Sequence, residues 1–252
     1  MRIGILGAML EEVSAIKELI QVDGETFIAR RKFIEGKFKS NDVILTFSRW
    51  GKVAAATTAT VLINKYHIDS LLFIGVAGAV HSTLNIGDLV IGSGLYQHDM
   101  DARPFFAQFQ IPLTNNIIFR TNTKEINNAT LAANRFINKI SSVISRETLT
   151  KHCILNPQVH IGIIASGDKF INNPKEHQNL CLSDEGQTTL AVEMEGAAVA
   201  QVCNEHAIPY LVVRTISDKA DHTAVSDYQS FIQNIASPYL AGFVAEYLEI
   251  IK

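Results

Sequence analysis

The chain has 252 residues, of which 47% are hydrophobic and only 19% are charged, with a formal net charge of −3. A chain of this size buries roughly 70–75% of the surface that its unfolded form exposes, so its core needs no disulfide or metal. The weak, scattered charge gives no basic patch for nucleic acid or an anionic membrane, and no apolar run reaches the ~18 residues that span a bilayer. We expect a soluble, cytoplasmic protein that folds as one domain over residues 1–252.

Segments typical of strands and segments typical of helices alternate along the whole chain. Short apolar runs, typical of strands buried on both faces, are separated by longer stretches of helical composition. This alternation predicts an α/β fold with a mostly parallel sheet covered by helices, and sites beyond the carboxyl ends of the strands. The predicted strands are residues 2–7, 43–47, 71–74, 89–91, 159–164 and 210–216, and the predicted helices are 11–20, 53–66, 127–144, 195–206 and a last one that Ser237 caps before Pro238.

Acidic residues follow the first strand, where Glu11 and Glu12 open a predicted helix. The turn before them lacks GxGxxG and the phosphate-binding Lys-Ser/Thr pattern, so it does not favour a dinucleotide or triphosphate. A helix start keeps a carboxylate ionised and able to accept a proton. The alternative is that both acids only occupy the first turn of the helix and have no role in a functional site.

Small residues follow two of the apolar strands. Glycine lets a backbone turn sharply or approach a ligand closely, although a tight strand-to-helix turn needs the same residues. Aromatic and aliphatic neighbours could offer a flat apolar surface to a planar ligand, or belong to the core. These segments contain Gly75, Val76, Ala77 and Gly78 after one strand, and Ser166, Gly167, Asp168, Phe170 and Ile171 after the other.

The segment between these strands in the chain, residues 92–122, is the least regular one and mixes Gly, Pro, Phe and Asn. Long excursions inside compact domains are usually functional or have structure of their own. We therefore expect a lid or an interface segment here.

Two carboxylates, Glu193 and Glu195, lie in an otherwise small and apolar stretch at residues 191–200. Glutamate is almost never fully buried unless it is paired or hydrogen-bonded. In extended backbone the two side chains face the same side, whereas in a helix they diverge by about 200°. The pair could accept hydroxyl protons from a sugar, or form a buried structural network at the entrance of a helix.

Another apolar strand ends at Asp218, with Asp221 and His222 just beyond. Asp218 could protonate a leaving group or bond the edge of a heterocycle, or it could simply cap the next element. Together with residues 98–101, Asp221 and His222 could also suggest a metal-dependent hydrolase, but their spacing fits no common metal site.

The three cysteines, Cys153, Cys181 and Cys203, are odd in number, far apart and without a CxxC. This spacing predicts neither a disulfide framework nor a zinc site. We expect buried thiols in a reducing compartment.

Taken in order, these segments resemble the 5′-methylthioadenosine/S-adenosylhomocysteine nucleosidases of the purine nucleoside phosphorylase superfamily. The resemblance runs from residue 1 to about residue 231. It implies a three-layer fold with a mostly parallel or mixed central sheet between helices, and a homodimer. It also implies hydrolysis of 5′-thio-substituted adenosines to adenine, without a metal or organic cofactor. The matching strings are Ile3-Gly4-Ile5-Leu6-Gly7-Ala8-Met9 with Glu11-Glu12, Gly51-Lys52-Val53-Ala54-Ala55-Ala56, Ala165-Ser166-Gly167-Asp168 with Phe170-Ile171, Val192-Glu193-Met194-Glu195, and Val213-Arg214-Thr215-Ile216-Ser217-Asp218.

The resemblance also implies roles for individual residues. Glu12 is the general base on the attacking water, Asp218 is the general acid that protonates N7 of adenine, and Arg214 lies near the water and the acids. Glu195 and the Met194 backbone hold the ribose hydroxyls. Phe170 stacks on adenine. Met9, Phe105, Pro112 and Tyr228 line the 5′-alkylthio pocket, some of them from a second subunit. The whole substrate-binding set comprises Met9, Val76, Ala77, Gly78, Phe105, Pro112, Phe170, Ile171, Glu193, Met194, Glu195, Ser217 and Tyr228.

The chemistry agrees with these roles. Breaking a glycosidic bond builds positive charge on the sugar, so a nearby carboxylate stabilises the transition state more than the ground state. Adenine leaves poorly as an anion, and an acid at N7 removes that difficulty. We expect a buried strand end to raise the pKa of Asp218 and a helix start to keep Glu12 ionised.

Some positions depart from the family pattern. Val76 and Ala79 replace a serine and a glycine, and Arg49-Trp50 stand where small or aliphatic residues are usual. Because arginine binds phosphate, Arg49 and Arg103 support a phosphate-dependent nucleoside phosphorylase as the alternative. The loss of the serine hydroxyl supports a nucleoside-binding protein without turnover. The preferred 5′ substituent stays open among methylthio, homocysteine, deoxy and futalosine-type groups.

Overall fold

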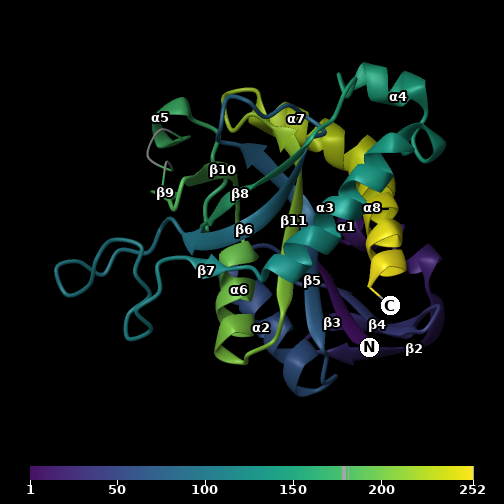
Figure 1. Cartoon of the computed structure of the whole chain (residues 1–252), viewed down its shortest axis with the longest axis horizontal. Coiled ribbons are helices and arrows are strands. Elements are labelled where there is room, and N and C mark those ends of the chain that lie inside the picture. Colours follow the sequence, from purple (N-terminus) through teal and green to yellow (C-terminus); the bar gives the residue numbers. More distant parts are fainter. Residues whose placement is uncertain (178–179, 181, 252) are drawn as a thin grey trace.

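A mixed β-sheet forms the middle layer of the molecule in a computed structural model that describes residues 1–177, 180 and 182–251 (Figure 1). Within these residues the sheet has 11 strands in the order β2-β3-β4-β1-β5-β11-β6-β8-β10-β9, with β7 paired to β6. The strands are β1 (Arg2–Gly7), β2 (Gln21–Ile28), β3 (Arg31–Phe38), β4 (Asn41–Phe47), β5 (Ser70–Ala79), β6 (Leu89–Gln97), β7 (Phe119–Arg120), β8 (Val159–Ser166), β9 (Ser183–Asp184), β10 (Gln187–Glu193) and β11 (Tyr210–Asp218).

Parallel pairing dominates the centre of the sheet. Strand β1 lies parallel to β4 and β5, β5 to β11, and β8 to both β6 and β10, while β6 and β11 are antiparallel. A further antiparallel pairing joins β10 to β5 through Ala191–Ala79 and Val192–Gly78. This pairing closes β5, β11, β6, β8 and β10 into a ring, which brings strand ends from distant parts of the chain together.

Helices cover both faces of the sheet. Successive side chains of a strand point to opposite faces, so Leu72 and Ile74 of β5 join one core cluster while Leu71 and Phe73 join the other. Helices α1, α3 and α8 contribute to the first cluster, and α2 and α6 to the second. The predicted three-layer α/β fold is therefore confirmed. The helices are α1 (Leu10–Val13), α2 (Lys52–Asn64), α3 (Thr123–Asn138), α4 (Arg146–Lys151), α5 (Pro174–His177), α6 (Gly196–Glu205), α7 (Ala224–Phe231) and α8 (Ser237–Ile250).

Three helix predictions need correction. The helix expected over residues 127–144 begins at Thr123 and ends at Asn138, and a separate 3-10 turn at Ile140–Ser142 follows it. The helix expected over residues 11–20 stops at Val13, and a 3-10 turn at Lys17–Leu19 leads into β2 instead. Ser237 does not cap α8, because a π-helical turn at Ile232–Ala236 runs directly into this helix and gives Ser237 helical dihedral angles. Its hydroxyl lies 2.7 Å from the Ser14 hydroxyl, so it joins α8 to the end of α1 rather than starting a helix.

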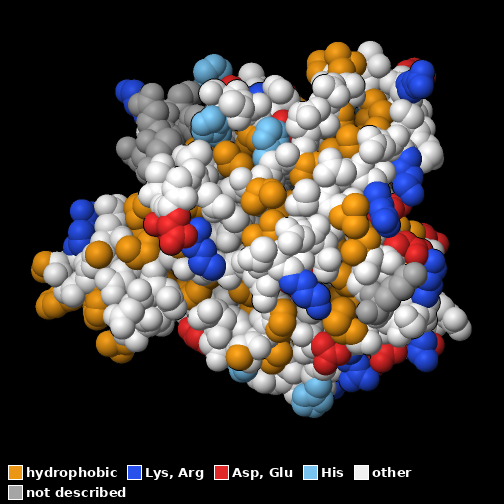
Figure 2. Space-filling model, viewed as in Figure 1, with side chains coloured by type: hydrophobic (Ala, Val, Ile, Leu, Met, Phe, Trp, Pro, Cys, Tyr) orange, Lys and Arg blue, Asp and Glu red, His pale blue; other side chains and the backbone are white. Residues whose placement is uncertain are grey.

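The irregular excursion is shorter than expected, because β6 continues to Gln97. Residues 98–118 then leave the body of the molecule as a long projecting segment, and Figure 2 shows hydrophobic side chains gathered there. Phe105 and Leu113 of this segment are 86% and 90% exposed. The description as an excursion is confirmed for these residues.

The cysteines do not all behave as predicted. Cys203 is buried, and burial raises its pKa to about 12. Cys153 is exposed in a left-handed turn after α4, so the prediction was wrong for this residue. Cys181 lies outside the described residues. Across the described part of the chain, no helix combines the length and apolar character needed to cross a membrane.

Candidate active site

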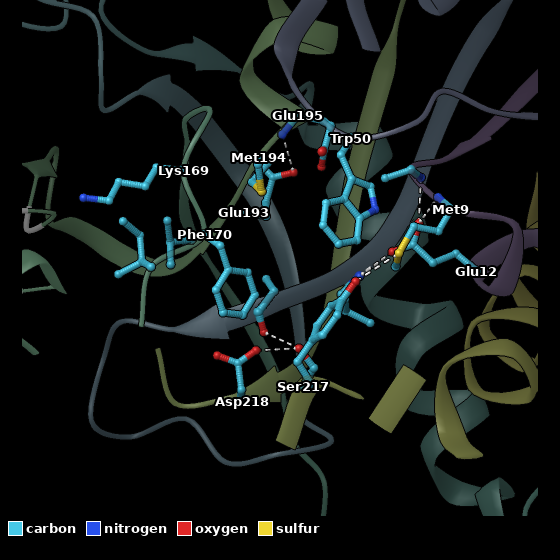
Figure 3. Close-up of a pocket in the computed structure, with 16 residues that line it drawn as sticks. Met9, Glu12, Trp50, Lys169, Phe170, Glu193, Met194, Glu195, Ser217 and Asp218 are labelled. Carbon is cyan, nitrogen blue, oxygen red and sulfur yellow. Dashed lines mark hydrogen bonds between the residues drawn. The ribbon is translucent and has the colours of Figure 1, made fainter. Parts of the chain in front are cut away.

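A cavity opens at the carboxyl ends of β1, β5, β8, β10 and β11, where the closed part of the sheet gathers polar side chains. Its space, including the part open to solvent, is about 550 Å³. Figure 3 shows Glu12, Glu195 and Asp218 on three different sides of this cavity, with the rings of Trp50 and Phe170 among them. The lining residues are Ala8, Met9, Glu12, Trp50, Val76, Ala77, Lys169, Phe170, Ile171, Val192, Glu193, Met194, Glu195, Ser217, Asp218 and Tyr228.

Glu12 enters the cavity from the first turn after β1. Met9 is the N-cap of α1, and the Glu12 side chain folds back toward it. Glu12 Oε2 accepts from the backbone N–H of Ala8 at 2.6 Å and of Met9 at 3.0 Å, and Oε1 accepts from Val76 N–H at 3.1 Å. The carboxylate is thus buried and held by two strand ends, β1 and β5.

The charge of Glu12 is less favoured than the helix start predicts. Burial raises its pKa, and although Arg214 and the three backbone N–H groups lower it, the net shift is upward. Helix α1 has only four residues, so its dipole is weak beside the loss of water. A raised pKa makes the ionised carboxylate a stronger proton acceptor.

Two glycines of β5 make room for the carboxyl groups. A Cβ on Gly75 would lie 2.7 Å from Glu12 Oε1, and one on Gly78 would lie 2.9 Å from Asp218 Oδ1. Both glycines lie within the strand rather than in the turn that the sequence suggested. The strand thus lets Glu12 and Asp218 pack directly against its backbone.

Asp218 is the last residue of β11 and is buried. Its Oδ1 accepts from the Ala220 N–H at 2.9 Å and its Oδ2 accepts from the Ser217 hydroxyl at 2.8 Å. Burial raises the pKa of Asp218 to about 6, with smaller opposing contributions from these two hydrogen bonds. The direction agrees with the expectation for an acid at an apolar strand end.

Glu193 and Arg214 form an ion pair in the wall of the cavity. Glu193 Oε2 lies 2.6 Å from Arg214 Nη2, and both side chains are buried. Glu193 also accepts from the Ser166 hydroxyl and from the Gly196 N–H at the start of α6. The Arg214 guanidinium lies 4.1 Å from the centre of the Phe73 ring. Glu193 therefore belongs to a buried network that fixes Arg214, which is one of the two interpretations the sequence left open.

Glu195 behaves differently, although only Met194 separates it from Glu193. It is the N-cap of α6, and its Oε1 accepts from the Gly51 N–H at 2.7 Å. Burial, together with the nearby Glu193 charge, raises the pKa of Glu195 to about 8. This carboxyl group lines the cavity and can form hydrogen bonds with hydroxyl groups of a ligand.

Aromatic side chains form the remaining wall. Tyr228 meets Phe170 edge-on at 5.6 Å and Trp50 at 6.3 Å between ring centres. The Tyr228 hydroxyl donates to the Met9 sulfur at 3.0 Å. A flat apolar slot next to convergent carboxyl groups suits a planar heterocycle joined to a polar sugar.

Most of the predicted site residues lie together here, but four do not line the cavity. Gly78 and Arg214 lie directly behind the wall, against Asp218 and Glu193 respectively. Phe105 and Pro112 lie on the projecting segment, outside the lining of this chain's own cavity.

Four lining residues were not among the predicted ones: Ala8, Trp50, Lys169 and Val192. Trp50 carried a signal, because it is the only tryptophan of the chain. Ala8 and Val192 adjoin predicted residues and carry no chemical signal of their own. Lys169 directly precedes Phe170, and its ammonium group pairs with Glu176 at 2.7 Å.

The two arginines that favour a phosphorylase lie outside the cavity lining. Arg49 is exposed and donates to the Arg30 carbonyl at 2.9 Å, and Arg103 pairs with Asp101 at 2.5 Å. Among the described residues, no group of three or more His, Cys, Asp or Glu side chains could hold a metal ion. Within residues 98–101, which suggested a metal site, Asp99 forms an ion pair with Lys52 instead.

The chain is similar to known proteins along nearly its whole length. A family model described as the phosphorylase superfamily matches residues 2–249. The chain is 34% identical over 235 residues to the 5′-methylthioadenosine/S-adenosylhomocysteine nucleosidase of Staphylococcus aureus strain JH9. The aligned region covers 93% of each of the two chains.

Solved structures of similar proteins include both nucleosidases and a futalosine hydrolase. The Neisseria meningitidis nucleosidase in complex with methylthio-immucillin-A is 27% identical, with a TM-score of 0.84 and 98% of each chain covered. The futalosine hydrolase of Helicobacter pylori strain 26695 is 32% identical, with a TM-score of 0.81 and coverage of 99% of this chain and 97% of the other.

Proposed function

This chain belongs to the 5′-methylthioadenosine/S-adenosylhomocysteine nucleosidases of the phosphorylase superfamily, and we propose that it hydrolyses the N-glycosidic bond of 5′-thio-substituted adenosines. The products are adenine and the thioribose. One observation carries the proposal: Glu12 of α1 and Asp218 at the end of β11, both buried, converge on a single cavity with an aromatic slot. Two carboxyl groups in distinct environments can serve as the base and the acid of one reaction.

Asp218 is the general acid. The bond between C1′ and N9 breaks with its electron pair moving into the purine, and N7 takes the proton from the Asp218 carboxyl group. Burial raises the pKa of Asp218 to about 6, so about one-tenth of the molecules carry this proton at pH 7. Adenine then leaves as a neutral base.

Glu12 is the general base. A water molecule attacks C1′ from the side opposite to the purine, its oxygen forms the new bond to carbon, and Glu12 takes its proton. Three backbone N–H groups hold the ionised carboxylate in place before reaction. Its negative charge also stabilises the positive charge that develops on the sugar ring.

Glu195 and the Met194 backbone hold the ribose hydroxyls, while the adenine ring packs against Phe170. Hydrogen bonds to sugar hydroxyls strengthen as charge develops in the transition state, so this contact contributes to rate as well as to affinity. Glu195, Met194 and Phe170 all line the same cavity as the two catalytic carboxyl groups.

The enzyme acts as a homodimer in the cytoplasm, in the salvage of methionine-derived nucleosides. Phe105 and Pro112 lie away from this chain's own cavity, and Phe105 is 86% exposed. A projecting segment with exposed apolar side chains fits a partner surface. The 5′-alkylthio pocket is then completed from a second copy of the chain.

A second substrate class is favoured by the similarity to the Helicobacter pylori futalosine hydrolase. A futalosine-type nucleoside presents the same purine–ribose bond with a bulkier 5′ group. Since the proposed catalytic contacts are to the purine and the ribose, the same residues serve either substrate.

The test is product analysis with 5′-methylthioadenosine, with and without phosphate, followed by chromatography. Release of adenine and free methylthioribose at equal rates under both conditions is the expected result. Strict phosphate dependence with a sugar 1-phosphate as product would establish a phosphorylase instead. No free purine base from either 5′-methylthioadenosine or a futalosine-type nucleoside, with tight binding of the nucleoside, would establish a binding protein without turnover.

A further inference from the structure

Three segments that are distant in sequence meet just outside the cavity lining. Lys52 opens α2, Asp99 follows β6, and Asp168 follows β8. Lys52 Nζ lies 2.6 Å from Asp99 Oδ1, the Asp168 N–H donates to Asp99 Oδ2 at 2.9 Å, and the Lys52 N–H donates to Asp168 Oδ1 at 2.7 Å. These three residues, here called the clamp, form a closed ring of hydrogen bonds. None of them lines the cavity.

The clamp holds the peptide next to Glu195. Gly51 directly precedes Lys52, and its N–H donates to Glu195 Oε1 at 2.7 Å. Gly51 has a φ of +93°, and a Cβ there would lie 3.0 Å from Asp168 Oδ1. The clamp thus encloses Gly51 in a backbone conformation that other residues rarely adopt, with its N–H aimed at the carboxyl group.

The ion pair of the clamp is partly shielded from water. The Lys52 side chain is only 16% exposed. Burial alone would raise the pKa of Asp99, but the Lys52 ammonium and the Asp168 N–H outweigh it and lower that pKa. Lys52 Nζ also donates to Gln97 Oε1 at 3.0 Å, and Gln97 Nε2 donates to Gln201 of α6 at 2.8 Å. The clamp is therefore tied to the helix that Glu195 caps.

We propose that Lys52, Asp99 and Asp168 are positioning residues, which keep the Gly51 N–H on Glu195 and so orient this carboxyl group toward the ribose hydroxyls. The inference rests on the proposed function, in which Glu195 binds those hydroxyls. A donor fixed before the substrate arrives costs no reorganisation during the reaction. Without the clamp, the Gly51 peptide rotates, and the Glu195 carboxyl group loses its set direction.

The test compares two substrates that differ only in the hydroxyl groups that Glu195 binds. We expect Asp168→Ala and Asp99→Ala to lower kcat/KM for 5′-methylthioadenosine about 10-fold or more. For the 2′,3′-dideoxy analogue the same variants should stay within about two-fold of the wild type, because the oriented carboxyl group then has no hydroxyl to meet. Each rate is divided by the wild-type rate on the same substrate, so the intrinsic lability of the analogue cancels.

Matched variants separate positioning from general damage. Asp168→Asn keeps an oxygen that can accept from the Lys52 N–H, so it should retain most of the activity that Asp168→Ala loses. Lys139→Met removes an ion pair with Glu246 at 2.5 Å, away from the cavity, and should leave both substrates unaffected. Equal losses on the hydroxylated and the dideoxy substrate in folded variants would overturn the inference.

Hydrogen exchange of the Gly51 amide tests the clamp without any substrate. We expect this amide to exchange at least about ten times faster in Asp168→Ala than in the wild type. Unchanged Gly51 protection in a folded variant would overturn the clamp itself. If the wild type cleaves neither 5′-methylthioadenosine nor its 2′,3′-dideoxy analogue, the proposed function fails. The hydrogen-exchange result still decides whether the clamp holds the Gly51 N–H.

Discussion

The floor and the mouth of the cavity are held in different ways. The floor, formed by Glu12, Glu193 and Asp218 with Arg214 directly behind them, is buried, and each of its carboxyl groups accepts a hydrogen bond from the backbone. The mouth is here defined as Trp50, which lines the cavity and is 56% exposed, together with the projecting segment 98–118, which lies outside this chain's own cavity lining. The proposed reacting groups therefore lie in the buried core, on α1 and at the end of β11. Phe105 and Pro112, two of the residues expected at the 5′ pocket, lie on a segment that the core does not constrain.

The largest effects belong to the floor. Glu12→Gln and Asp218→Asn should each lower kcat for 5′-methylthioadenosine about 10²–10⁴-fold, because each removes a proton transfer from the transition state. Steady-state kinetics with circular dichroism as a folding check measures this. Glu11→Gln, at the exposed neighbour of Glu12, is the matched control and should keep full activity. Wild-type rates in both Glu12→Gln and Asp218→Asn would contradict the assignment of Glu12 as the base and Asp218 as the acid.

The buried ion pair should govern stability more than any charge at the mouth. Arg214→Met leaves Glu193 buried without its partner, which should lower the free energy of unfolding by about 3–5 kcal/mol. Arg103→Met breaks an exposed pair on the projecting segment and should leave the free energy of unfolding nearly unchanged, because water and salt screen such pairs. Urea denaturation compares the two, and similar losses in both would remove the distinction between floor and mouth.

Three carboxyl groups of the cavity, Glu12, Glu195 and Asp218, have raised pKa values, so the pH dependence is assigned with a variant. As the proposed general acid, Asp218 acts in its protonated form, and its pKa of about 6 means that a rising pH removes the active form. We expect kcat/KM to decline on the alkaline side, from about pH 6 upward, approaching ten-fold per pH unit. Rates of the wild type and of Asp218→Asn measured from pH 5 to 9 check this, and an alkaline decline of equal slope in Asp218→Asn would contradict it.

The mouth should affect substrate affinity through a second copy of the chain. Phe105→Ala should raise KM for 5′-methylthioadenosine about 10-fold with little change in kcat, since burying such a ring contributes about 1.5–3 kcal/mol. Leu155→Ala, an exposed apolar residue elsewhere, is the control. Sedimentation should show a dimer for the wild type. A monomer, or an unchanged KM, would show that the projecting segment does not complete the pocket.

The last effect concerns stability alone, through Glu195, whose pKa of about 8 lies above the ordinary value of 4.5. Its protonated form stabilises the fold at low pH, and this contribution, about 3 kcal/mol between pH 5 and pH 8, is lost as the pH rises toward 8. Glu195→Gln cannot lose a proton. The Tm difference between this variant and the wild type should therefore shift in favour of the variant by about 6–12 °C from pH 5 to pH 8. A constant difference across this range would mean that Glu195 is ionised throughout.

The sequence predicted the placement of Glu12 and Asp218 in the floor because the signals for these two residues are local. Strand β1 matches its prediction from Arg2 to Gly7, and β11 extends it only to Asp218, since continuous apolar runs are buried on both faces. Acids that directly follow such runs must lie at the carboxyl edge of the sheet. The positions of Glu12 and Asp218 beside one cavity follow from these two facts.

Other parts depend on partners that the local pattern does not reveal. The β2–β3 hairpin was missed because β2 is an edge strand, largely exposed and rich in polar residues. Strand β10 was missed because Glu193 lies within its buried end, where its partner Arg214 comes from a distant strand. The direction of the Glu12 pKa shift was missed because burial, not the short helix, dominates it.

The central claim is that Asp218 acts on the leaving group and Glu12 on the water. It is tested most directly with a 5-methylthioribosyl substrate whose leaving group is p-nitrophenolate, an anion that departs without a proton. We predict that Asp218→Asn, crippled on 5′-methylthioadenosine, cleaves this substrate within about ten-fold of the wild type, while Glu12→Gln stays about 10²-fold or more impaired on both. Equal impairment of Asp218→Asn on the two substrates, or recovery of Glu12→Gln on the activated one, would contradict the assignment.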